Sequence, residues 1–311
     1  MVDAPSLCVS APSLFVTVTV EAGEDGIDDI HFHAGGQGFW VARMLRELGM
    51  RPVLCGPVGG ESGRVLRGLA SATGIDLALV SVGTESPCYL HDRRSGERIE
   101  LAEHPARELG RHDLDNLFGR TLAQAIDSGS CVVTGRPGGG GVPVEFYRRL
   151  GADLAATDVM TIGDLHGDEL DAFLDGGPLR LLKVSDEDLI DDGALSEGDA
   201  EAAVWVAVDK LIDRGVDGIV VSRGDKPVLA RFGSDRFTAE TPGLEPVDDR
   251  GAGDSMTAGL AAATVEGKPP DDVLRLGCGA GAANVTRHGL ASADAKLIDR
   301  VAPLVVIKEV P

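Results

Sequence analysis

The feature that most constrains the fold is a regular alternation of short β-rich runs with longer helical stretches. The predicted strands span 131–134, 159–162, 179–184 and 218–222, and the predicted helices span 113–126, 144–155, 199–213, 254–265 and 271–287. Repeated strand–helix units bury each strand between helices and give a mainly parallel sheet that is covered on both faces. We therefore predict an α/β three-layer sandwich.

Two segments, 7–34 and 86–103, carry β-type patterns without intervening helices. Residues 15–20 alternate with period two, which is typical of a half-exposed strand. We interpret the two segments as a small β lid on a single domain that spans 1–311. An exposed strand edge tends to find a partner, so we also predict a homodimer that forms through the lid.

Composition excludes several function classes. Apolar residues make up 43% of the chain, which is enough for a real core, and 50 acidic against 29 basic residues give a net charge of −21. Such a charge repels nucleic acids and anionic membrane surfaces. The sequence shows no apolar run long enough to span a membrane and no secretion signal, so a cytoplasmic protein is expected. The five cysteines form no Cys-x-x-Cys pair, which argues against zinc ribbons.

The sharpest chemical motif is the glycine-rich turn Gly251, Ala252, Gly253 and Asp254, which runs directly into a predicted helix. Free N–H groups at a helix start bind anions, and glycines let the backbone approach an oxyanion closely. A carboxylate at the same turn is suited to accept a proton from an attacking hydroxyl, as phosphoryl transfer requires. The helix end should lower the pKa of Asp254 and weaken it as a base. The alternative interpretation is a plain glycine turn capped by an aspartate.

This motif, continued by Ser255 and Met256, resembles the C-terminal signature of the ribokinase/PfkB family of carbohydrate kinases, and is most similar to its 1-phosphofructokinase and tagatose-6-phosphate kinase branch. Further segments resemble family motifs in order and spacing: 34–43 with 59–63, 134–147, 182–189 and 221–224. The resemblance implies a ribokinase-like fold, ATP as phosphoryl donor and Mg²⁺ as cofactor.

The resemblance also implies roles for individual residues. Asp254 would be the catalytic base, and the amides of Gly251, Ala252 and Gly253 would form the anion hole. Asp188 would help to organise Mg²⁺ through water. The residues expected near the nucleotide are Lys183, Ser185, Ser222, Gly224 and Asn284, and the residues expected near the acceptor are Gly35, Gly36, Gln37, Trp40, Phe15 and Arg136.

The acceptor side departs from the family pattern. Ala11 and Phe15 stand where the phosphosugar branch has Asn and Asp, Gln37 replaces a Lys and Trp40 replaces an Asn. The Arg-x-Asn element expected around 87–90 is missing, and Arg136 replaces a small residue. Loss of several charge-assisted contacts should weaken the binding of a standard phosphosugar strongly. The two aromatic side chains instead offer flat apolar surface for a larger or less polar acceptor.

We conclude from the sequence that the chain is an ATP-dependent kinase for a hydroxyl of a sugar or phosphosugar-like acceptor. Two alternatives stay open: a kinase for a nucleoside or another non-standard acceptor, and a non-catalytic ligand-binding protein on the same scaffold. A thermal shift with ATP and Mg²⁺ would favour a kinase over the binding protein.

Other motifs admit both a functional and a plain structural interpretation. His31 and His33, beside Asp28 and Asp29, fit either a metal cluster or a polar strand edge. The loop 164–169 fits either an acidic metal site, with Asp164 as a secondary candidate, or helix-capping acids. The glycines of 138–141 fit either a phosphate cradle or a flexible loop. The Gly-rich stretch 277–281 lacks a preceding strand and therefore argues against a dinucleotide fingerprint.

Overall fold

The structure, a computed structural model, describes residues 4–23, 25–136, 140–245, 247, 250–287 and 290–310. The main sheet runs in the order β16 (Val306–Val310), β15 (Asp235–Glu240), β14 (Lys226–Phe232), β13 (Gly218–Arg223), β12 (Leu181–Ser185), β11 (Met160–Asp164), β10 (Ser130–Thr134), β1 (Ser6–Ser10), β4 (Arg51–Cys55) and β6 (Asp76–Leu77). Neighbours from β13 to β6 are parallel, and β13 to β16 are antiparallel. The predicted mainly parallel sheet is therefore confirmed.

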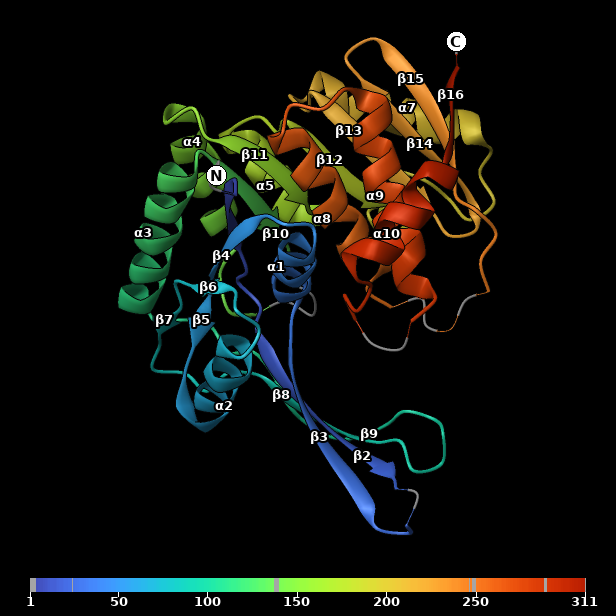
Figure 1. The fold of residues 1–311 in the computed structure, drawn as a ribbon. Coiled ribbons are helices and arrows are strands. Elements are labelled where there is room, and N and C mark those ends of the chain that lie inside the picture. The colour runs from blue at the N-terminus through green and yellow to red at the C-terminus, as the bar shows by residue number, and fades with distance from the viewer. Residues whose placement is uncertain are drawn as a thin grey trace.

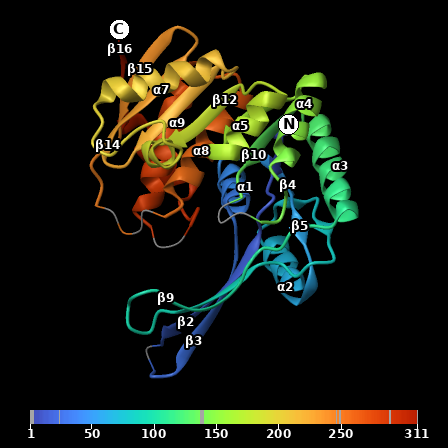
Figure 2. The ribbon, with the colours of Figure 1, turned by 180° about the vertical axis from the view of Figure 1, so that it is seen from behind.

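Helices cover both faces of this sheet (Figures 1 and 2). One core cluster packs the sheet against α1 (Gln37–Glu47), α2 (Gly60–Ser71), α8 (Ala252–Val265), α9 (Pro270–Val285) and α10 (Ala295–Val301), which continues into the 3-10 helix η1 (Ala302–Leu304). The other cluster packs it against α3 (Arg111–Ser128), α4 (Glu145–Ala156), α5 (Gly167–Gly176), α6 (Asp186–Asp191) and α7 (Glu201–Asp213). The layers are those of the predicted three-layer sandwich.

A second sheet forms the lid, in the order β3 (Asp28–Gly35), β2 (Phe15–Ala22), β8 (Cys88–Asp92) and β9 (Ile99–His104). It projects away from the body below α1 (Figure 1). Because side chains alternate along a strand, the pairing between the strands shows which residues share a face of the lid sheet. Val18 lies opposite Phe32 and Leu90 on an apolar face, whereas Thr17 lies opposite His33 and Tyr89 on a polar and aromatic face. A further short sheet joins β5 (Pro57–Val58) and β7 (Val80–Ser81).

The lid begins later than predicted. The expected boundary of 7–34 included Ser6–Ser10, but this strand lies in the main sheet between β10 and β4. Its apolar residues Leu7, Cys8 and Val9 are completely buried, so they belong to the core of the sandwich. The lid strands lie within 15–35 and 88–104.

The carboxyl ends of the central strands meet on one edge of the main sheet. Thr134 and Asp164 end β10 and β11, and Ser185 ends β12, level with Ser222 on β13. Ligands of open α/β sheets bind outside the carboxyl ends of the strands. The same edge carries most of the residues that the sequence singled out.

Candidate active site

The glycine-rich turn forms the start of α8, as predicted. Gly251 caps the helix with a left-handed backbone conformation, at φ 75°, which glycine adopts without strain. The first N–H groups of a helix lack carbonyl partners within it, so the turn presents donors and the positive end of the helix dipole. Asp254 lies in the first turn of α8 and is partly buried.

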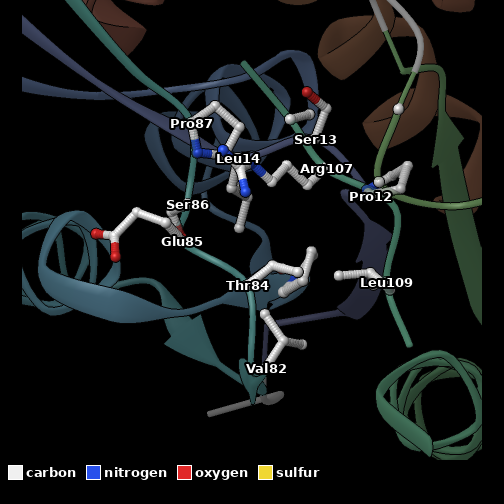
Figure 3. A pocket seen from close by; sticks show the side chains of 14 residues that line it. Pro12, Ser13, Leu14, Val82, Thr84, Glu85, Ser86, Pro87, Arg107 and Leu109 are labelled. Atoms are coloured by element: carbon white, nitrogen blue, oxygen red, sulfur yellow. The ribbon is translucent and has the colours of Figure 1, made fainter. Parts of the chain in front are cut away.

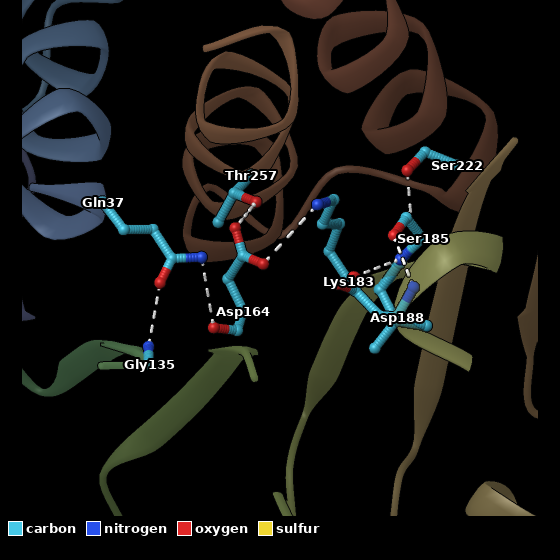
Figure 4. A network of polar contacts seen from close by, with 9 residues as sticks. Gln37, Gly135, Asp164, Lys183, Ser185, Asp188, Ser222 and Thr257 are labelled. Atoms are coloured by element: carbon cyan, nitrogen blue, oxygen red, sulfur yellow. Dashed lines mark hydrogen bonds and ion pairs between the residues drawn. The ribbon is translucent and has the colours of Figure 1, made fainter. Parts of the chain in front are cut away.

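A buried charged group lies beside this turn (Figure 4). Lys183 Nζ, on β12, lies 3.6 Å from Asp164 Oδ1, at the end of β11, and both side chains are less than 10% exposed. Thr257, one turn along α8 from Asp254, donates a 2.5 Å hydrogen bond to Asp164 Oδ2. A Cβ built on Gly253 would lie 3.0 Å from Lys183 Nζ, so the ammonium group lies directly against the glycine turn. Sequence reasoning gave Asp164 only a secondary place and missed Thr257, whose i+3 spacing from Asp254 was the available signal.

The protonation of Asp254 differs from the prediction. Burial, the largest cause, and the nearby carboxylate of Asp164 together raise the pKa of Asp254 to about 7, against the opposing charge of Lys183. The predicted lowering by the helix end is therefore wrong, because burial and like charge outweigh it. A base is most effective when its pKa lies near the operating pH, so this environment suits proton abstraction at neutral pH.

Lys183 keeps its positive charge despite its burial. Burial alone would lower the pKa of the ammonium group, but the carboxylates of Asp164, Asp188 and Asp254 together raise it. The group therefore offers a fixed cation beside the turn, which is what a phosphate needs.

Other residues predicted to contact the nucleotide lie at the ends of the next strands. Ser185 pairs with Ser222 across β12 and β13, and the Ser222 hydroxyl donates to the Val184 carbonyl at 3.4 Å. Ser185 and Asp188 form a reciprocal capping box: the Asp188 carboxylate accepts from the Ser185 amide at 2.7 Å, and the Ser185 hydroxyl accepts from the Asp188 amide at 3.0 Å. Gly224 forms the β13–β14 turn at φ 59°. The acidic run that begins at Asp186 thus starts as the capped helix α6.

Asn284 is completely buried on α9. Its amide nitrogen donates to the Arg250 carbonyl at 3.0 Å, and its side-chain oxygen accepts from the Ser292 amide at 3.0 Å. These bonds attach the residue before Gly251 to α9. The geometry gives Asn284 a positioning role for the glycine turn.

On the acceptor side, Gln37 connects two strand ends. Its side-chain oxygen accepts from the Gly135 amide at 2.9 Å, and its amide nitrogen donates to the Asp164 carbonyl at 3.4 Å (Figure 4). Gly36 caps α1 at φ 124°, where a Cβ would lie 2.3 Å from the Ser13 carbonyl oxygen. Gln37 thus links the start of α1 to Asp164. Through Asp164 it lies close to the glycine-rich turn 251–254, which we call the transfer turn.

Phe15 and Trp40, both predicted near the acceptor, belong to one aromatic cluster. Their ring centroids are 5.7 Å apart in an edge-to-face arrangement, and Phe15 makes a similar contact of 5.2 Å with Tyr89 on the lid. A Cβ on Gly35 would lie 2.4 Å from the Phe15 ring. Tyr89 was not predicted as a site residue, although its place in the altered 87–90 segment was the available signal.

Arg136 already has a partner in the structure. Its Nε lies 2.8 Å from Glu169 Oε1 on α5, and each side chain is 17% exposed. An anion that contacts Arg136 would therefore compete with Glu169.

A pocket lies at the base of the lid (Figure 3). It is lined by Ser13, Thr84, Pro87, Arg107 and their neighbours, together with Gly140 and Gly141. Gly138 and Gly139, the other half of the predicted phosphate cradle, lie outside the described residues.

Among the described residues, no group of three or more His, Cys, Asp or Glu side chains is placed to hold a metal ion. His31 and His33 stack with centroids 6.0 Å apart and are exposed on β3. Mg²⁺ that enters with nucleotide phosphates needs only one or two carboxylates, and Asp164 and Asp188 lie near Lys183. The donor set fits a metal of that kind.

None of the described helices is both long and apolar enough to cross a membrane.

Known proteins resemble this chain over most of its length. It is 26% identical to the ATP-dependent 6-phosphofructokinase isozyme 2 of Escherichia coli, over 83% of each chain. It is 29% identical to the 1-phosphofructokinase of Xanthomonas campestris, over 75% of this chain and 74% of the relative.

Solved structures show the same fold. The structure of phosphofructokinase-2 from Escherichia coli in complex with potassium matches with a TM-score of 0.84 at 22% identity, and covers 96% of this chain and 98% of the other. A carbohydrate kinase from Agrobacterium tumefaciens matches with a TM-score of 0.74 at 20% identity, over 99% of this chain and 100% of the other. The ribokinase-like α/β fold predicted from the sequence is thus confirmed.

Residues 182–296 match the pfkB family carbohydrate kinase model. This range contains Lys183, Asp188, Ser222 and Asn284 as well as the whole transfer turn. Together with the curated relatives, the match supports a PfkB family carbohydrate kinase domain in this chain.

Proposed function

We propose that this chain transfers the γ-phosphoryl group of ATP to a hydroxyl of a sugar or phosphosugar-like acceptor. The observation that carries the proposal is the pairing of two groups at one turn. Asp254, whose pKa of about 7 suits a base, lies beside the buried cation Lys183 at the positive end of α8. Base, cation and amide donors are the parts that phosphoryl transfer needs.

In the proposed reaction, Asp254 accepts the proton of the acceptor hydroxyl as its oxygen attacks the γ-phosphorus in line. The amides of Gly251, Ala252 and Gly253 bind the phosphoryl oxygens, and Lys183 balances their charge. The bond between the γ-phosphorus and the β,γ-bridging oxygen breaks, and ADP leaves. Mg²⁺, bound with the nucleotide, would add charge neutralisation, and Asp188 and Asp164 are the residues that would hold it.

The nucleotide contacts proposed for Ser185, Ser222 and Gly224 are supported by their place at the ends of β12 and β13. Asn284 supports the same site by holding the Arg250 carbonyl. We keep Gly35, Gly36 and Gln37 as the proposed acceptor contacts, because Gln37 joins them to Asp164.

The non-catalytic alternative is weakened by the environment of Asp254. A protein that only binds ligands has no need of a carboxyl whose pKa is raised to about 7 by burial and by a second aspartate. The relatives named 6-phosphofructokinase and 1-phosphofructokinase support a carbohydrate acceptor.

We further propose a homodimer through the apolar face of the lid. Phe32 is 51% exposed and Ile30 is 59% exposed on β3, and Ile99, opposite Asp92, is 48% exposed on β9. Exposed apolar faces of this kind mark interaction sites. One structure of Escherichia coli phosphofructokinase-2 is described as a tetrameric inhibited form. Sedimentation that shows only monomer at micromolar concentration would refute the dimer. A cytoplasmic location stays a prediction from the sequence.

The proposed function is tested by coupled ADP release from ATP and Mg²⁺ with a panel of sugars, phosphosugars and nucleosides, for the wild type and Asp254→Asn. Stimulation by an acceptor that disappears in the variant supports the proposal. Turnover that no acceptor stimulates contradicts it. ATP and Mg²⁺ should raise the melting temperature of both proteins, since binding to the folded state stabilises it.

A further inference from the structure

The aromatic cluster extends as a line of rings from α1 onto the lid. Trp40 contacts Phe15, Phe15 contacts Tyr89, and Tyr89 stacks on His91 with a centroid distance of 6.3 Å and an interplanar angle of 12°. Register places Phe15, Tyr89 and His91 on the same face of the lid sheet, because Thr17 lies opposite Tyr89 and Thr19 opposite His91. The rings therefore form one surface built from three separate segments.

This surface adjoins the transfer site. Trp40 follows Gln37 by three residues on α1, so the two side chains leave the helix on the same side. Gln37 donates to the carbonyl of Asp164, whose carboxylate lies 3.6 Å from the Lys183 ammonium nitrogen. The line of rings thus begins one helical turn from a residue that contacts the transfer machinery.

The other end of the line is His91, which is buried. The positive charge of Arg250, the residue before Gly251, acts on its ring. The polar and aromatic face of the lid thus carries a ring within electrostatic reach of the residue that precedes the transfer turn.

The rings are only partly buried, so they offer surface to a ligand. Phe15, Trp40 and Tyr89 are all half-buried, whereas a ring of the core such as that of Tyr147 is completely buried. Gly35 leaves room for the Phe15 ring, since a Cβ there would lie 2.4 Å from it. Aromatic side chains in this arrangement bind a flat ring of a ligand better than they bind hydroxyl or phosphate groups.

We propose that the acceptor is a sugar that carries an aromatic ring, and that Trp40, Phe15 and Tyr89 bind that ring while the sugar hydroxyl faces Asp254. The inference rests on the proposed function, because it assumes that the bound sugar is phosphorylated. Binding of the aromatic ring can nevertheless be measured without any turnover.

The test uses matched sugars that differ in one substituent: phenyl and methyl β-D-glucopyranoside, phenyl and methyl β-D-galactopyranoside, and uridine and methyl β-D-ribofuranoside. Calorimetric titration with a saturating non-hydrolysable ATP analogue keeps the ring-bearing sugars off the nucleotide side. We expect at least one ring-bearing sugar to bind about tenfold or more tightly than its methyl counterpart. Equal or undetectable binding of every pair overturns the inference.

The variants Trp40→Leu and Tyr89→Leu should each reduce that preference to about threefold or less, with unchanged affinity for the ATP analogue. The matched control is Trp205→Leu on α7, whose ring lies against Arg236 instead, and it should keep the full preference. A preference that survives both lid-side variants contradicts the proposed role of the rings.

Turnover separates this inference from the proposed function. Ring-bearing sugars that bind with the expected preference but are never phosphorylated would refute the kinase assignment and leave the binding site. Phosphorylation of methyl and phenyl sugars with equal kcat/KM and equal affinity would support the kinase and refute the aromatic site.

Discussion

The two sides of the candidate site are built on different physical principles. The transfer side, most of which lies within 182–296, holds charged groups in fixed proximity: Lys183 and Asp254, with Asp164 from the end of β11, lie around one glycine turn. The acceptor side, at the junction of α1 and the lid, holds half-buried aromatic rings such as Phe15 and Trp40. The match to the family model covers only the first of these.

This difference shows which part of the site tolerates change. Phosphoryl transfer has the same charge requirements for every acceptor, so the charged group and the amide donors must be kept. Recognition of the acceptor depends on the acceptor, and a scaffold can exchange polar contacts for rings without altering the transfer step. The predictions below test whether the two sides are separable.

The largest expected effect is on the transfer side. Asp254→Asn removes the proposed base and should lower kcat by about 10²- to 10⁴-fold, the usual contribution of general base catalysis. Binding of ATP and of the acceptor should persist, as calorimetry can show. A variant that keeps more than a tenth of the wild-type kcat would contradict the role of Asp254.

Asp254→Asn should lower kcat but raise the stability of the folded protein relative to the wild type as the pH rises. Since the pKa of Asp254 is raised from 3.8 to about 7 in the folded protein, the folded state holds the proton more tightly than the unfolded chain. The wild type should therefore lose stability as the pH rises from about 4 to about 7. Asp254→Asn lacks this titration, so its melting temperature relative to the wild type should increase across that interval.

The next effect concerns the buried cation. Lys183→Met leaves Asp164 and Asp254 without their opposing charge, and loss of one partner of a buried pair costs about 3–5 kcal/mol. We expect a large rise in the KM for ATP and a lower free energy of unfolding by urea. The matched control Lys226→Met, at an exposed position of β14, should leave both unchanged. Normal ATP affinity in Lys183→Met would argue against a nucleotide contact.

The sequence predicted the glycine turn and the start of α8 because the information for them is local. A glycine turn that enters a helix, with an aspartate in the first turn, indicates an anion site without any knowledge of distant contacts. The strand–helix alternation likewise predicted the main sheet, since each element carries its own periodicity. The lid boundary failed because Leu7, Cys8 and Val9 continue a β-type segment in sequence but pair with β10 and β4 in space.

The electrostatics could not be predicted from local sequence. Asp164 lies 90 positions before Asp254, yet it helps to raise the pKa of that carboxyl instead of letting the helix end lower it. The turn at 59–63 shows the same limit, because Gly60 adopts a left-handed conformation, at φ 67°, beside a carboxylate from a remote segment. A Cβ on Gly60 would lie 1.7 Å from Glu85 Oε2, whose carboxylate caps the first turn of α2 through Ser62.

A smaller effect should distinguish the glycines of the two sides. Gly35→Ala places a Cβ 2.4 Å from the stiff Phe15 ring, so it should cost about 1–3 kcal/mol of stability and alter acceptor binding. Gly253→Ala meets only the flexible end of Lys183 at 3.0 Å, so it should cost less stability and act mainly on the KM for ATP. Urea unfolding and steady-state kinetics of both variants give the comparison. The two sides are not separable if both variants change the KM for ATP equally.

The smallest expected effect is a displacement of the pH profile by Asp164→Asn. The asparagine can still accept the hydrogen bond of Thr257, but it no longer repels a charge on Asp254. The pKa of Asp254 should therefore fall below about 7, and the acid limb of kcat/KM should move to lower pH, because the base becomes deprotonated earlier. Asp168→Asn, an exposed change in the first turn of α5, should leave the limb in place. Equal profiles for the wild type and Asp164→Asn would mean that burial alone sets the pKa of Asp254, and a shift toward higher pH would contradict the electrostatic account of the site.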